Sequence, residues 1–357
     1  MTDIRISPRY RLQRYLAGGY ALFIAYVSLS PFTGWQEQGL YFIDVLSAPL
    51  AQTFTTFDFI LNCVSYFPFG FFLGYILRGR RPAVQVMLLA SLGGLCLSIS
   101  MEYAQMYLPA RISSNTDLLS NTLGTFAGSA FALKIAEYAW FSRIASWHDK
   151  WFRHDLVSDF GLALVALWMF AQINPTLPML GSVFVSEVAR WPFDIVPAAP
   201  FNWLECTEVA FNLLLLGILL HTLMRERRYT MNALLLLLCA VTLTKFIAAA
   251  ILLKSWALLL WLNSEAVLGI IIGLLVLAAA IRLPRNWLFV FGALLAISYL
   301  VQVQEQLLAG TPSASMRMYH WHYLHMLNYN GLSQLASFLF PVLFLFYLWR
   351  TAMQRKE

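Results

Sequence analysis

The sequence predicts an all-α, polytopic membrane protein, a transmembrane helical bundle of about ten spans with both termini in the cytoplasm. The composition is the first reason: of 357 residues, 60% are hydrophobic and 12% are charged. A soluble domain has roughly 45–50% apolar and about 25% charged residues. So few charged side chains do not cover a globule of this size in water, which excludes a soluble enzyme.

The second reason is a series of long apolar runs. A bilayer core about 30 Å thick needs roughly 20 apolar residues in a helix. Ten segments reach or approach this length: 15–32, 57–77, 83–103, 116–138, 157–175, 204–224, 231–253, 256–281, 286–304 and 334–349. The first follows four arginines, as in a signal peptide, but no small-residue cleavage site follows it, so we expect an uncleaved helix.

The third reason is the distribution of positive charge. Most of the 24 lysines and arginines lie in alternate connections between the apolar runs. Apart from Lys134 near the end of the fourth run, the other connections and the runs themselves hold only Arg111, Arg190, Lys245, Lys254 and Arg317. Because positive residues are retained on the cytoplasmic side, this bias predicts an even number of crossings and cytoplasmic termini.

The net charge of +6 does not indicate a nucleic-acid partner, because the basic residues form short clusters rather than one continuous face. The expected partner is the lipid bilayer. The four cysteines, Cys63, Cys96, Cys206 and Cys239, lie in apolar runs without CxxC spacing and are interpreted as small buried hydrophobic residues.

Three long connections, 33–56, 174–203 and 305–333, are rich in proline and aromatic residues, and we expect them to lie along the outer membrane surface. No connection is large enough for a cytoplasmic catalytic domain. We expect two domains, residues 1–145 with four spans and residues 146–357 with six.

The two domains share landmarks that suggest a duplication, although chance explains them as well. Asp58 precedes Gly70 by twelve residues, as Glu205 precedes Gly217. A basic turn follows each, and a GxxxG pair follows later, at Gly124 and Gly128 and at Gly269 and Gly273.

The candidate site is a group of polar residues at the outer ends of the second, third and fourth spans. Charged groups inside a membrane are costly and are rare without a partner or a role. Seven such residues are expected to bind a ligand: Asp58, Asn62, Glu102, Gln105, Arg111, Asp117 and Asn121. The pairs within each span are three or four residues apart, so each pair shares one helix face.

The fourth span continues its polar face as a glycine stripe. Asp117, Asn121, Gly124 and Gly128 occupy one face, and the glycines permit a neighbouring helix to approach closely. In the second span, Pro68 and Gly70 permit a kink or an opened turn.

These residues resemble the VanZ-like family of bacterial membrane proteins, named for a teicoplanin (glycopeptide) resistance determinant. The resemblance rests on Asp58, Asn62, Pro68 and Gly70, and on the block from Glu102 to Gly128, and covers roughly residues 20–140. It implies a bacterial inner-membrane protein of the cell envelope, in some cases linked to antibiotic resistance. The family often has His or Lys near the start of its second helix, where this sequence has Phe59 and Ser65.

The cluster has three carboxylates and one guanidinium. If Arg111 pairs with one carboxylate, two acids remain, which favours a cation, an amine-bearing ligand or bound protons. A lipid phosphate is accommodated if one acid is protonated or a Mg²⁺ ion bridges. A polar network that only holds three helices together is the structural alternative.

Three functions remain open. The first is binding or translocation of an envelope precursor, such as a lipid-linked glycan, with Arg111 gripping an anionic group. The second is an intramembrane enzyme that modifies an envelope lipid or glycan with Glu102 or Asp117 as general base. The third is a non-catalytic assembly partner of polysaccharide or peptidoglycan machinery. No serine nucleophile elbow, phosphate loop or HExxH motif is present, and no cofactor is indicated.

Two further features have polar side chains. His320, His322 and His325 are candidate metal ligands on the outer side, although an interfacial aromatic helix is the favoured interpretation. Lys245 lies deep in the seventh span and is expected to pair with Glu265 or Glu208, whereas Glu205 and Glu208 are expected near the membrane interface.

Overall fold

The computed structural model confirms an all-α protein. It describes residues 11–30, 32–39, 41–48, 56–79, 81–109, 111–141, 143, 150–153, 155–181, 201–253, 255, 258–259, 261–309 and 323–354, with the backbone alone at 305–309 and 323–330. Within these ranges there is no β-sheet, only one isolated antiparallel bridge between Phe152 and Met224. The chain divides into two compact units, Met1–Lys150 and Trp151–Glu357.

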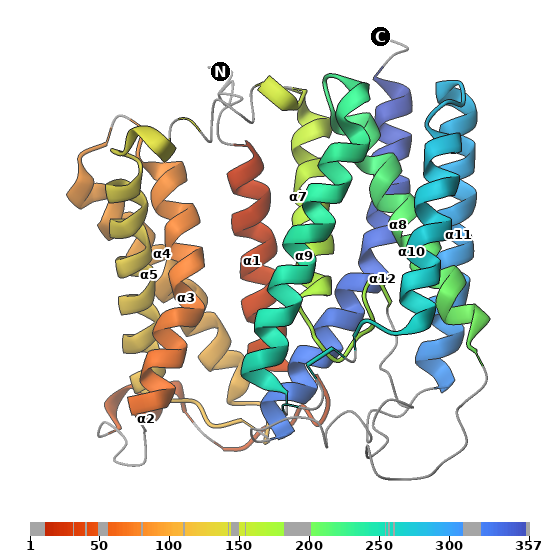
Figure 1. Ribbon diagram of the computed structural model, residues 1–357. Helices are drawn as coiled ribbons and strands as arrows, with labels where there is room; N and C mark the ends of the chain where they lie inside the picture. The colour runs from red at the N-terminus through yellow and green to blue at the C-terminus, as the bar shows by residue number, and fades with distance from the viewer. Residues whose placement is uncertain are drawn as a thin grey trace. The chain divides into compact units, whose positions relative to one another are not determined.

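In the part of the chain that the structure describes, five named helices belong to the first unit (Figure 1). They are α1 (Arg11–Leu29), the short α2 (Phe42–Ser47), α3 (Thr56–Leu77), α4 (Ala83–Gln105) and α5 (Asn115–Ile135). Helices α3, α4 and α5 run alternately up and down, so the start of α3, the end of α4 and the start of α5 lie at one end of the unit. Helix α1 packs against α3 and α4.

The second unit is built around a central helix. Its elements are α7 (Leu156–Gln172), α8 (Trp203–Leu223), the 3-10 helix η2 (Arg227–Tyr229), α9 (Thr230–Leu252), α10 (Ser264–Ala280), α11 (Arg285–Ala309) and α12 (Tyr323–Met353). Helix α8 contacts all five other α-helices of the unit. It is apolar on every side, as expected of a helix surrounded by protein.

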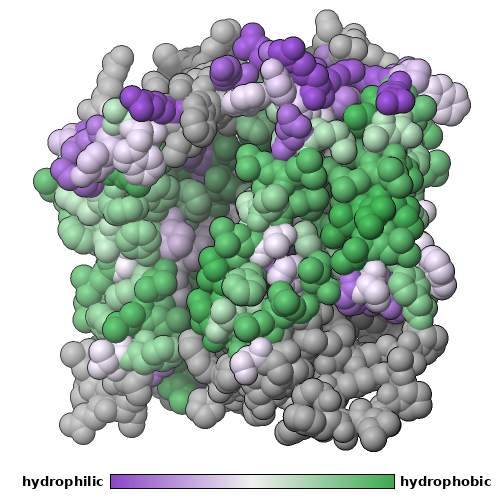
Figure 2. Space-filling view, viewed as in Figure 1, coloured by the Kyte–Doolittle hydropathy of each residue, from purple (hydrophilic) through white to green (hydrophobic). Residues whose placement is uncertain are grey.

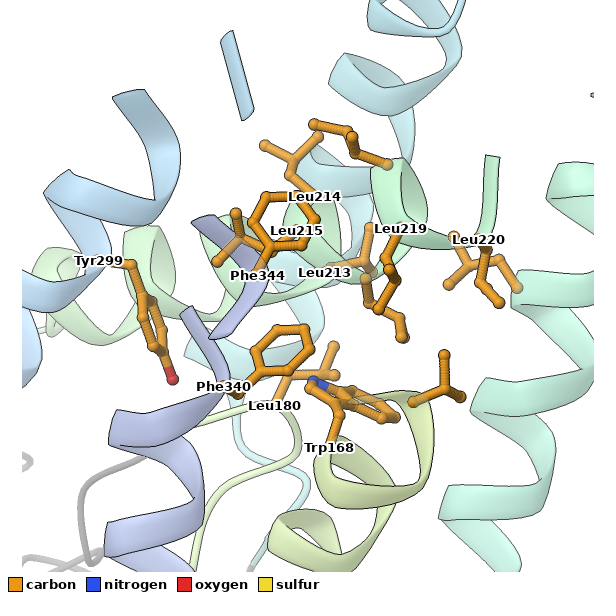
Figure 3. Close-up of a cluster of buried hydrophobic side chains, with 14 of the residues drawn as sticks. Trp168, Leu180, Leu213, Leu214, Leu215, Leu219, Leu220, Tyr299, Phe340 and Phe344 are labelled. Atoms are coloured by element: carbon orange, nitrogen blue, oxygen red, sulfur yellow. The ribbon is translucent and has the colours of Figure 1, made fainter. Parts of the chain in front are cut away.

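The core of this unit joins α8 to α7, α11 and α12. Figure 3 shows Phe340 and Phe344 of α12 directed toward Trp168 of α7 and the leucines of α8. Trp168 also donates a hydrogen bond from Nε1 to Asn212 Oδ1 of α8 at 2.6 Å. The indole is therefore buried with its polar atom satisfied.

Each of the ten predicted spans coincides with one helix, and six helices are long and apolar enough to cross a membrane. These are α3, α4, α8, α9, α11 and α12. On the face that Figure 2 shows, apolar side chains cover the middle of the helices and hydrophilic ones gather toward one end. Helix α5 has 21 residues, but the polar side chains it turns toward α3 and α4 lower its hydropathy. Helices α7 and α10 have 17 residues each. The protein is therefore a multi-pass membrane protein whose bilayer partner follows from its helices, and the ten-span count stays a prediction.

Two expectations about burial were wrong. Residues 174–181, expected on the outer surface, are buried within the second unit. The four cysteines are free, but Cys96 and Cys239 are exposed on α4 and α9 rather than buried. In apolar helices such positions face the lipid, where a small apolar side chain is equally suitable.

Candidate functional site

The predicted polar residues of α3, α4 and α5 come together at one end of the first unit. Asn62 Nδ2 of α3 donates a hydrogen bond to Asp117 Oδ1 of α5 at 2.7 Å. The charge of Asp58 acts on Asp117, and the charge of Asp117 acts on Glu102, so the three carboxylates share one electrostatic environment. Antiparallel packing of three successive helices explains this convergence, because it places their polar ends side by side.

Glu102 is the most buried of the three acids, with 3% of its surface exposed. Its Oε2 atom accepts a hydrogen bond from the backbone N–H of Ser114 at 2.8 Å. Ser114 is the N-cap of α5, and its hydroxyl accepts from Thr116 N. The carboxylate therefore lies at a helix N-terminus, where a negative charge is stabilised.

A second polar layer lies one helical turn deeper. Asn121 Nδ2 of α5 donates to Ser98 Oγ of α4 at 2.9 Å, and Tyr66 of α3 lies beside Ser98. Each residue of this layer lies four positions along its helix from a residue of the first layer. The pairs are Asn62 and Tyr66, Glu102 and Ser98, and Asp117 and Asn121. Tyr66 and Ser98 were not predicted, although this spacing would have found them.

Two atoms of the deeper layer are buried without a partner. Neither the Tyr66 hydroxyl nor Asn121 Oδ1 makes a hydrogen bond of good geometry with the described residues. Tyr66 is 4% exposed and Asn121 is 6% exposed. Buried polar atoms are usually satisfied by protein, ordered water or a ligand, so these two atoms indicate a position for a hydrogen-bonding group.

Arg111, for which pairing with a carboxylate was one possibility, binds the end of α1 instead. Its Nη2 atom donates to the carbonyl oxygens of Val27 at 3.0 Å and Ser30 at 2.8 Å, at the C-terminal end of α1. Burial lowers the pKa of Arg111, but an arginine remains protonated in proteins. A cation at the last carbonyls of a helix is favourable, which explains why the guanidinium binds α1 instead of an acid.

Gln105 also binds the C-terminal end of α1. Its Nε2 atom donates to the Ser28 carbonyl at 3.0 Å. Two of the seven predicted residues, Gln105 and Arg111, therefore hold α1 next to the cluster, and the other five form the cluster itself.

The glycine stripe packs against α3 as predicted. A Cβ atom on Gly124 would meet the Cys63 carbonyl, and one on Gly128 would meet the Phe67 carbonyl. From the other side, a Cβ on Gly74 would lie 2.7 Å from the Cα of Ser129. Helices α3 and α5 are therefore in backbone contact directly below the polar layers. Pro68 lies inside α3, which continues through it to Leu77.

Helices α8 and α10 repeat this crossing in the second unit. A Cβ on Gly269 would lie 2.6 Å from the Cys206 carbonyl, and one on Gly273 would lie 3.3 Å from the Ala210 carbonyl. At the end of this crossing, Asn263 Nδ2 donates to Glu205 Oε1. In this pair the acid belongs to the first helix, α8, and the amide to the start of the second, α10. In the first unit the amide belongs to α3 and the acid to α5.

Lys245 is fully buried, and its partners differ from the predicted glutamates. Its Nζ atom donates to the carbonyl oxygens of Gln172 and Asn174, both at 2.9 Å. These carbonyls end α7 and begin the buried segment 174–181, so the ammonium caps a helix that ends inside the protein. Glu208, in the second turn of α8, is also fully buried.

Most of the predicted histidine site lies outside the residues that the structure describes. His320 and His322 are not among the described residues, and only the backbone of His325 is described. Among the described residues, no group of three His, Cys, Asp or Glu side chains is arranged to hold a metal ion.

The fold and the cluster define a multi-pass helical membrane protein whose first unit carries the polar site. Residues 12–141 form a VanZ/LLP1 family domain, because they match the family model of that description. No curated protein and no solved structure matches the chain.

Proposed function

We propose that the VanZ/LLP1 domain binds an envelope precursor, such as a lipid-linked glycan, and assists its passage at the outer leaflet of the bacterial inner membrane. In this proposal the protein crosses the membrane ten times with both termini in the cytoplasm. The positive-inside bias then assigns the polar ends of α3, α4 and α5 to the outer side.

The two-layer polar cluster is the observation that carries the proposal. Asp58, Glu102 and Asp117 are hydrogen-bond acceptors when ionised, and Asn121 Oδ1 adds a buried acceptor without a partner. An acceptor-rich site selects a ligand rich in donors, such as the hydroxyl and amine groups of a glycan. A role for Arg111 in gripping an anion finds no support, since its guanidinium binds the end of α1.

A sugar unit suits this site because it carries several hydroxyl groups. Each hydroxyl can donate a hydrogen bond to one acceptor of the cluster.

A second candidate function is acid–base chemistry on an envelope lipid or glycan. The buried Glu102 carboxylate beside the charge of Asp117 favours it, because paired carboxylates with different environments perform general acid and base steps. A non-catalytic role in assembling envelope machinery is the third candidate. A link to teicoplanin tolerance belongs to the first proposal and follows if the bound precursor is the antibiotic's target.

Charge-neutral variants of equal size test the proposal. Glu102→Gln and Asp117→Asn are purified in nanodiscs and assayed for binding of a lipid-linked glycan, with Asp44→Asn on the exposed α2 as the matched control. We expect at least a tenfold weaker binding in the two site variants, wild-type binding in the control, and loss of teicoplanin tolerance in cells with the site variants. Unchanged binding in both site variants would overturn the proposal.

The same variants separate the alternatives. An enzyme loses product formation in Asp117→Asn while ligand binding persists. A scaffold retains its cellular phenotype in both site variants at normal membrane abundance.

A further inference from the structure

The second unit contains a basic cavity that the proposed function does not use. It is a shallow pocket that is partly open to solvent. Its polar lining is formed by Arg153, Arg227, Arg285, His221, Thr222 and Thr351. These residues come from four places in the chain: the segment before α7, the α8–η2 region, the start of α11 and the end of α12.

Backbone pairing fixes the position of Arg153 at this cavity. Arg153 N donates to the Leu223 carbonyl at 3.3 Å, and Arg225 N donates to the Trp151 carbonyl at 2.9 Å. These bonds join the segment before α7 to the end of α8. These backbone hydrogen bonds therefore fix the position of Arg153 next to the cavity.

Positive charge converges on the cavity, and none of the described residues that line it is acidic. The charges of Arg153 and Arg227 both act on the buried His221, whose Nδ1 atom is 3.0 Å from Thr230 Oγ1. Neither arginine side chain makes a hydrogen bond or an ion pair with the residues that the structure describes. Arg285 donates to the Thr351 carbonyl at 2.9 Å.

Two of the acids near the pocket have contacts of their own. Asp155 accepts from Ser158 N as the N-cap of α7, and Glu226 binds Arg228 at 2.8 Å. Guanidinium groups that face one pocket repel each other, so an anion between them is favourable.

We propose that this cavity binds the phosphate group of an anionic lipid headgroup. Arginine matches phosphate because its planar donors form two parallel hydrogen bonds to phosphate oxygens. The cavity lies at the helix ends, the level at which headgroups lie, and basic pockets between membrane helices are typical binding sites for anionic headgroups. Leu283 of the α10–α11 turn lines the cavity and is exposed, so it provides apolar surface for an acyl chain.

Retention of positive charge at one membrane face does not explain this arrangement by itself. The positive-inside bias requires a number of lysines and arginines in a connection, and Arg225 and Arg228 satisfy it on the surface. It does not require that arginines from three separate connections line one cavity.

Lipid binding by the full-length protein tests the proposal. Dissociation constants are measured by native mass spectrometry for phosphatidylglycerol and for phosphatidylcholine of the same chains, and inorganic phosphate is tested alone as a competitor. We expect tight binding of phosphatidylglycerol, at least tenfold weaker binding of phosphatidylcholine, and weak competition by phosphate. Phosphate that binds as tightly as the lipid would assign the cavity to a soluble phosphate and overturn the lipid proposal.

Arginine variants locate the site. Arg153→Gln and Arg227→Gln are expected to weaken phosphatidylglycerol binding at least tenfold, whereas Arg228→Gln on the same turn, whose side chain binds Glu226, leaves it unchanged. Arg153→Lys keeps the charge and is expected to lie between wild type and Arg153→Gln, which distinguishes a binding loss from a folding defect. Equal weakening by all three glutamine variants, or by none of them, would overturn the proposal.

Discussion

Asn62 and Asp117 join the first turns of α3 and α5 through a hydrogen bond of 2.7 Å from the amide to the carboxylate. The bond lies above the place where Gly124 and Gly128 bring the two backbones into contact. The polar end of the unit and its close backbone contact therefore both belong to the α3–α5 pair. Substitutions in the polar end and in the glycine contact test the two parts separately.

Asn62→Ala removes the donor and leaves Asp117 partly buried. Hydrogen bonds to charged groups contribute about 1.5–3 kcal/mol, and we expect a loss of that size in the free energy of unfolding. Chemical denaturation in mixed micelles measures it. A double-mutant cycle with Asp117→Ala then gives the coupling between the two residues, and a coupling of zero would show that the bond contributes nothing.

Gly128→Ala is expected to destabilise the first unit, because the new methyl group meets the Phe67 carbonyl. Overpacking of this kind costs about 1–3 kcal/mol. Gly19→Ala is the matched control, since nothing lies within 4 Å of its Cβ position in α1. A thermal unfolding assay should give a lower Tm for Gly128→Ala and an equal or higher Tm for Gly19→Ala, and a shared decrease would contradict the packing described for α3 and α5.

Lys245→Met removes the cation that binds the carbonyls of Gln172 and Asn174. We expect a loss of about 1.5–3 kcal/mol in stability, together with faster hydrogen exchange across residues 173–181. Lys134→Met is the control, because that lysine is exposed and its ion pair with Glu137 contributes at most about 1 kcal/mol. Equal exchange in wild type and Lys245→Met would show that the segment is held by other contacts.

Arg111→Ala is expected to loosen the end of α1 while the acid cluster stays intact. The carbonyls of Val27 and Ser30 lose their donor, so amide exchange should accelerate over residues 24–30. Arg111→Lys keeps the charge but not the fork of donors, and an intermediate effect is expected. If exchange accelerates around Asp117 instead, Arg111 acts on the cluster and not on α1.

The sequence supports the helix positions and the convergence of the cluster for simple physical reasons. Apolar runs of bilayer length predict helices, and short connections between them require antiparallel neighbours, which places Glu102 beside Asp117. The glycine stripe was predictable because a helix face without side chains must be covered by another backbone.

The partners of the buried cations were harder to predict from the sequence. Opposite formal charges made a carboxylate one possible partner of Arg111 and led to the prediction that Lys245 binds a glutamate. Both instead bind carbonyl oxygens at the end of a helix, and such ends are acceptors that no residue type in the sequence reveals. Tyr66 and Ser98 were missed because tyrosine and serine are common in apolar helices without any site.

The lengths of the helices also affect the surrounding lipid. If α10 crosses the bilayer as predicted, the hydrophobic stretch between Glu265 and Arg282 is about 24 Å long at 1.5 Å per residue. That is shorter than an average hydrocarbon core of about 30 Å, and a short span is accommodated by local thinning of the bilayer. Lipids with shorter chains should therefore gather beside α10, and the protein should reconstitute best in membranes whose hydrophobic thickness matches this side of the second unit.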